Sequence, residues 1–138
     1  PLGKIRNIAF TNIVADSEAG IVLWGEEPGQ IEDVTFDQVR LQLRNGPLSE
    51  SYGGNIDLRP AADPQRAIFK HDLAGVFCRG VDGLTLSQLD IRWSDNMPDY
   101  YVHAIWCEEA SRVVIDGFRQ LPVPCQMGPG RGTIRHDR

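Results

Sequence analysis

Apolar and polar residues follow one nine-residue pattern at four places in the chain, residues 5–13, 31–39, 81–89 and 110–118. Each copy begins with an apolar residue and two polar or turn-forming ones, continues apolar-x-apolar, and ends with two more polar residues and an apolar one. Alternation such as Val34-Thr35-Phe36 is typical of a strand with one buried face. The copies are offset by 26, 50 and 29 residues. Repeats of this period indicate a solenoid.

A second, shorter pattern lies between these copies, at residues 19–25, 74–80 and 103–109, with a ragged fourth copy at 131–136. Successive strand side chains point to opposite faces, so each copy divides into two sets. We assign the more uniformly apolar set to the interior: Ile21, Leu23, Val76, Cys78, Ile105 and Cys107. The other set, Val22, Phe77 and Trp106, then faces outward.

Together the two patterns predict an all-β fold, a right-handed parallel β-helix of about four coils, with residues 1–138 as a single domain. Short third strands are expected at 39–43 and 89–93. One coil cannot bury its apolar face alone, but stacked coils bury a continuous column. The long middle offset predicts an inserted loop over 44–73, with a degraded coil as the alternative. We also expect a projection at 94–101 and an extended connector at 119–130.

Amide side chains recur where the strands of the longer pattern must turn. Asn12, Gln38 and Gln88 occupy equivalent positions, and asparagine tolerates left-handed backbone. Stacked coils would align these side chains as an amide ladder. Gly117 takes the same position in the fourth copy and would end it.

The composition argues against nucleic acid, membranes and metal ions as partners. The chain has 14 basic and 19 acidic residues and no basic run, which argues against nucleic acid. No apolar run is long enough to span a membrane, so no membrane partner is expected. Three cysteines form no disulfide scaffold and no metal-binding spacing. No metal or other cofactor is predicted, and Cys78 and Cys107 are expected to pack in the core.

Neither end of the chain carries a polar cap, although terminal repeats need one for solubility. Uncapped strand edges also invite association. We therefore expect either a fragment of a longer solenoid or end-to-end self-association through the uncapped coils.

The repeats at 5–13, 19–28 and 31–39 resemble the C-terminal coils of bacterial polygalacturonase-type glycoside hydrolases of family 28. The Gly53-Gly54 loop with residues 57–60, and the segment 73–84, are similar to that family as well. The family belongs to the pectin-lyase-like right-handed β-helix class. The resemblance implies a secreted or periplasmic protein that hydrolyses pectin-type polysaccharide with inversion, using one carboxylic acid and one carboxylate.

The family carries its catalytic acids in an N-x-D element, an adjacent Asp pair, a G-H-G element and an R-I-K strand. Only Asn55-Ile56-Asp57 matches one of these formally, and the others do not follow it. No catalytic residue is therefore identified. Asp57 and Glu108 are weak candidates, and the resemblance places the catalytic coils before residue 1.

Five residues are candidates for binding the polysaccharide. Phe77 and Trp106 would stack on adjacent coils as an aromatic platform for sugar rings, unless the insertion or the tail covers them. His103 could face a cleft or serve a structural role. Arg59 and His71, in the insertion, could meet a carboxylate of the polymer or hold the loop to its own coil.

Two further functions remain open. A non-catalytic β-solenoid could bind carbohydrate, adhere or self-assemble. A lyase of the same fold would need a Ca²⁺-binding carboxylate cluster or a basic residue at the cleft, and the sequence shows no such carboxylate cluster. Arg79 and Glu108, at equivalent places in successive coils, are expected to form a surface ion pair without a functional role.

Overall fold

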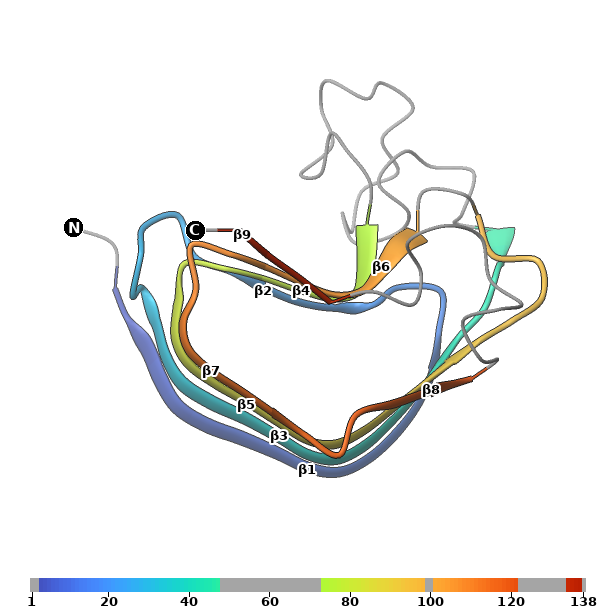
Figure 1. The fold of residues 1–138 in the computed structure, drawn as a ribbon, viewed down its shortest axis with the longest axis horizontal. Helices are drawn as coiled ribbons and strands as arrows, with labels where there is room; N and C mark the ends of the chain where they lie inside the picture. Colours follow the sequence, from blue (N-terminus) through green and yellow to red (C-terminus); the bar gives the residue numbers. More distant parts are fainter. Residues whose placement is uncertain (1–2, 48–72, 99–100, 122–133, 138) are drawn as a thin grey trace.

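The structure is a computed structural model that describes residues 3–47, 73–98, 101–121 and 134–137. These residues form two parallel β-sheets that face each other, and no α-helix occurs among them (Figure 1). The first sheet contains β1 (Ile5–Ser17), β3 (Ile31–Leu43), β5 (Val81–Trp93) and β7 (Ser111–Asp116), with β8 (Arg119–Leu121) also paired to β5. The second sheet contains β2 (Ile21–Trp24), β4 (Leu73–Arg79), β6 (Tyr101–Glu108) and β9 (Ile134–Asp137). The predicted all-β class is therefore confirmed.

The strand register follows the spacing of the sequence repeats. In the first sheet Ile5 pairs with Ile31, and Ile31 with Val81, which are the offsets of 26 and 50 residues. Leu84 of β5 pairs with Val113 of β7, which is the offset of 29. The shorter pattern is also aligned in the second sheet, where a single row contains Ile21, Val76, Ile105 and Ile134.

Two left-handed residues bend each long strand at fixed positions. Positive φ angles occur at one aligned set, Asn7, Asp33, Gly83 and Arg112, and at a second, Asn12, Gln38, Gln88 and Gly117. Asn and Gly adopt this conformation at low cost, and other residues do so less readily. Each such residue shifts the in–out alternation by one place. Apolar residues therefore recur two apart within a straight segment and three apart across a bend, which is the nine-residue pattern.

The core lies between the two sheets. Leu84, Leu86, Leu89 and Ile91 of β5 have no exposed surface, and Val76 and Ile105 pack opposite them. Cys78 and Cys107 pair in register and are buried free thiols, as expected for core packing. Their mutual hydrogen bond, together with burial, raises the pKa of the Cys78 thiol, which keeps it protonated.

Three details of the prediction need correction. The expected third strands at 39–43 and 89–93 are continuations of β3 and β5 rather than separate strands. Residues 119–121 form β8 instead of the start of a connector. Tyr101 begins β6 and is buried, and its hydroxyl donates to the Glu18 carbonyl, so it belongs to no projection. Most of the expected insertion, residues 48–72, lies outside the described residues.

Candidate functional site

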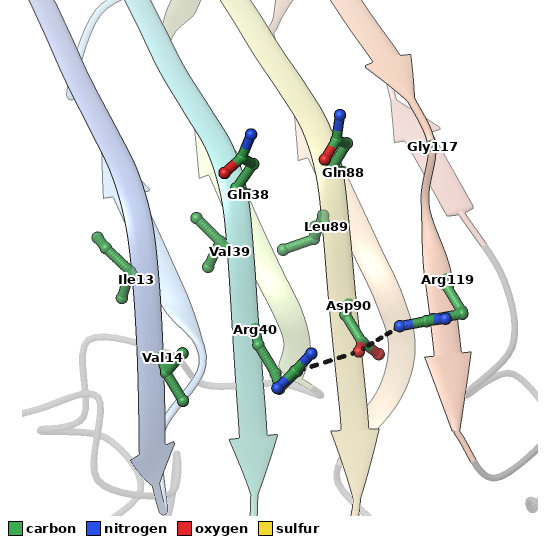
Figure 2. A pocket seen from close by; sticks show the side chains of 10 residues that line it. All are labelled: Ile13, Val14, Gln38, Val39, Arg40, Gln88, Leu89, Asp90, Gly117 and Arg119. Carbon is green, nitrogen blue, oxygen red and sulfur yellow. Dashed lines mark hydrogen bonds and ion pairs between the residues drawn. The ribbon is translucent and has the colours of Figure 1, made fainter.

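A groove of the described surface runs across the first sheet, beside the bend at Gln38, Gln88 and Gly117. It has a volume of about 420 Å³. Its ten lining residues come from β1, β3, β5, β8 and the β7–β8 connection, so it crosses the strands instead of following one (Figure 2). They are Ile13, Val14, Gln38, Val39, Arg40, Gln88, Leu89, Asp90, Gly117 and Arg119.

A single carboxylate organises the charge of this groove. Asp90 is only 6% exposed, and three guanidinium groups converge on its Oδ2 atom. Arg119 donates from Nη2 at 2.8 Å, Arg92 from Nη2 at 3.2 Å, and Arg40 from Nε at 3.4 Å. Figure 2 shows Arg40 and Arg119 reaching Asp90 from the two neighbouring strands. The second carboxylate oxygen, Oδ1, is buried and accepts no hydrogen bond.

The arginines keep Asp90 ionised. Burial by itself raises the pKa of the Asp90 carboxyl, but hydrogen bonds from Arg119 and Arg92 outweigh it, and the pKa lies below its ordinary value. Three permanent positive charges therefore surround one negative charge. Because the Arg40 and Arg119 side chains are 50% and 63% exposed, the excess positive charge faces solvent.

Sequence reasoning missed this cluster, although the signal was present. Adding the repeat offsets to residue 40 gives 90 and then 119, so Arg40, Asp90 and Arg119 occupy one row across β3, β5 and β8. The offsets were applied to the apolar core positions and to the turns. Applied to the outward-facing positions, the same offsets would have placed one arginine on each side of an aspartate.

The predicted aromatic platform is buried. Phe77 and Trp106 lie on adjacent strands in register and contact each other with ring centroids 5.7 Å apart, as expected for stacked coils. However, their exposed fractions are 0% and 5%, so the two rings are covered, which is the alternative to an open sugar-binding platform. Both faces of β4 are buried, because Val76 on the opposite face also has no exposed surface.

His103 takes part in the same aromatic cluster. Its ring meets Trp106 edge to face, with centroids 5.2 Å apart. Trp24 stacks on Phe77 at 5.9 Å, and Arg79 and Arg135 lie over the rings of Trp24 and Trp106. The contacts are those of a packed aromatic layer with cationic edges.

Arg79 forms an ion pair with Glu109 instead of the expected Glu108. Arg79 and Glu108 lie side by side in the register of β4 and β6, but the Arg79 guanidinium contacts the Glu109 carboxylate at 3.4 Å. Glu109 has a positive φ angle at the end of β6, which turns its side chain back toward Arg79. On its other side Glu108 lies in register with Asp137, whose carboxylate is held by Arg135 and the Trp106 indole N–H.

Asp57, Arg59 and His71 lie outside the described residues. Within the described ranges, no group of three or more His, Cys, Asp or Glu side chains is placed to hold a metal ion. No helix long and apolar enough to cross a membrane occurs among those residues either.

The fold and the groove together describe a parallel two-sheet protein with a cationic groove across its strands. Comparisons with protein-family models, with curated proteins and with solved structures found no match. The resemblance to polygalacturonase-type hydrolases therefore remains a prediction from the repeat motifs.

Proposed function

We propose that this chain forms coils of a right-handed parallel β-helix that acts on acidic polysaccharide of the pectin or galacturonan type. The chain alternates between two parallel sheets, and each return to the same sheet is a parallel crossover connection. Such connections are right-handed in about 98% of cases, because of the twist of the strands. This supports the right-handed β-helix over other arrangements of the same strands.

The observation that carries the polysaccharide function is the cationic groove that crosses the strands. Arg40 and Arg119 present guanidinium groups to solvent, and guanidinium matches the planar geometry of a carboxylate. A groove that spans several stacked strands suits an extended polymer. In a longer protein with these coils, the activity we propose is hydrolysis of O-glycosidic bonds, outside the cell or in the periplasm.

A panel of polysaccharides tests this function. We expect the 138-residue chain to be retarded in affinity gels that contain polygalacturonate and to pass unretarded through gels of neutral dextran. Reducing-sugar release, measured in parallel, should stay at the level of a protein-free control. Equal mobility in every gel would contradict the polysaccharide function. Hydrolysis would show that this chain carries its own catalytic acids, and Glu108 would be the first described residue to replace.

A second candidate function is a stacking module that associates end to end. Among the described strands β1 pairs only with β3, so its other edge has no strand partner. Ile5 and Phe10 on this strand are 52% and 37% exposed, and an apolar hollow of about 310 Å³ opens between β1, β2 and β3. An exposed apolar edge of this kind favours pairing with a second copy. Analytical sedimentation of the same samples distinguishes the stacking module from the polysaccharide function, because only the stacking module gives particles that grow with protein concentration.

A further inference from the structure

The two exposed arginines of the groove keep most of their hydrogen-bond donors. Asp90 accepts one N–H from Arg40 and one from Arg119, while each guanidinium carries five N–H groups. Since Asp90 holds both side chains at one end, less conformational entropy remains to be lost when a ligand binds. The groove thus presents two guanidinium groups that are already oriented.

The charge of the groove selects an anion. Asp90 is the single acidic residue among the ten that line the groove, and it is buried beneath the arginines. With Arg92 included, three positive charges face one negative charge. A ligand oxyanion would supply the missing negative charge and make a charge-assisted, bidentate hydrogen-bonded pair.

The extent of the groove favours a polymer over a small ion, because its lining runs from Ile13 on β1 to Arg119 on β8. Arg40, Asp90 and Arg119 lie in register on β3, β5 and β8, and neighbouring strands are about 4.8 Å apart. The backbones of the two arginines are therefore separated by two strand spacings, roughly 10 Å, while their guanidinium groups converge on Oδ2 of Asp90. Gln38 and Gln88 lie two residues earlier on β3 and β5, about 7 Å along the strands. Their side chains stand parallel at the groove edge (Figure 2).

We propose that this groove binds a polyuronate that runs across the strands, with its carboxylates on the guanidinium groups of Arg40 and Arg119. The amide groups of Gln38 and Gln88 bind sugar hydroxyl groups at the opposite edge. Gly117 takes the place next to Gln88 in this row, the fourth after Asn12 and Gln38. It has no side chain, which leaves that end of the groove open for the polymer to continue. This inference rests on the proposed polysaccharide function and specifies the acidic ligand and its direction.

Calorimetric titration with an oligogalacturonate tests this assignment. We expect Arg40→Gln and Arg119→Gln each to weaken binding by roughly 10-fold, which is the loss of one charge-assisted pair. The double variant should bind more weakly than either single variant, but not by the simple product, because both arginines share Asp90. Arg112→Gln is the matched control, because Arg112 is equally exposed and pairs with Asp33 and Asp82 outside the groove. Gln tolerates its left-handed backbone, as it does at residues 38 and 88. Unchanged far-UV circular dichroism confirms that each variant is folded.

Three further ligands identify the chemistry. The methyl-esterified oligomer should not bind, because esterification removes the carboxylate charge. Dextran sulfate and inorganic phosphate should bind at least 10-fold more weakly than the uronate oligomer. If the double variant binds the oligogalacturonate as tightly as the wild type, this inference is wrong while the polysaccharide function stands. Equal binding of dextran sulfate or phosphate overturns the uronate assignment, and absence of binding to every polymer overturns the proposed function itself.

Discussion

Replacement of Phe77 by alanine should lower the free energy of unfolding by about 3–5 kcal/mol, the usual cost of deleting a fully buried aromatic ring. The ring has no exposed surface, and it lies between Trp24 and Trp106. Its loss removes apolar burial and two aromatic contacts and leaves a cavity on a strand whose neighbours on both sides are fixed by the sheet. Urea unfolding followed by far-UV circular dichroism measures the change.

Phe10→Ala is the matched control for this substitution. Phe10 also belongs to a stacked pair, with its centroid 4.8 Å from that of Phe36, but its side chain lies at the β1 edge and is 37% exposed. We expect it to cost less than half as much as Phe77→Ala, since less surface is buried. Equal effects of the two substitutions would show that Phe77 is not buried in solution. The open platform predicted from the sequence would then be correct.

Asp90→Ala should produce the second large effect, a fall of about 2 kcal/mol in the free energy of unfolding. Hydrogen bonds to charged groups each contribute roughly 1.5–3 kcal/mol, but the exposed arginines recover part of their hydration when the carboxylate is removed. The substitution leaves Arg40, Arg92 and Arg119 without their shared acceptor. Asp16→Ala is the control, because Asp16 pairs with Arg44 at the surface with a side chain that is 64% exposed. Its expected cost is below about 0.5 kcal/mol. Equal costs for the two aspartates would contradict the organising role of Asp90.

The stability that Asp90 contributes should also depend on pH. The folded pKa of the Asp90 carboxyl lies below its ordinary value, so folding favours the ionised form. The contribution is present in full above the unfolded pKa of about 3.9 and is lost as the pH falls through the lower folded pKa. The difference in stability between the wild type and Asp90→Asn should be constant from about pH 5 to pH 8 and should shrink below about pH 4. A difference that grows on acidification would contradict the ion cluster.

The strand register was predictable because it depends on local pattern. Each bend needs a residue that tolerates left-handed backbone, and each bend shifts the side-chain alternation by one place. Sequences that satisfy both conditions repeat at 26, 50 and 29 residues, and the parallel pairing of Ile31 with Ile5 and Val81 follows those offsets. Inward orientation of Val76, Cys78 and Ile105 was predictable for the same reason.

Burial of the outward face was not predictable from alternation. The pattern places Phe77 and Trp106 on the face opposite Cys78, but alternation says only where a side chain points and nothing about what packs on it. The Arg79 ion pair was misassigned for a related reason. Glu109 follows β6 with a positive φ angle and takes the ion pair that Glu108, the register partner of Arg79, was expected to form. No repeat offset contains that information.

The arginine cluster depends on three residues that are 50 and 29 positions apart in the chain. None of them stands out locally, because a lone arginine on a strand is usually a solvated surface residue. Only the register shows that Asp90 lies between Arg40 and Arg119, and only the structure shows that Asp90 is buried.

The central claim is that a polyuronate binds the row formed by Arg40, Asp90 and Arg119. Nitrogen-15 NMR of the arginine Nε–Hε groups tests it most directly, with each signal assigned from its Arg→Gln variant. Titration with an oligogalacturonate should shift the Arg40 and Arg119 signals in a saturable way and leave the Arg112 signal in place. If the oligomer binds while only signals away from the groove shift, the polymer occupies another surface and the claim is wrong.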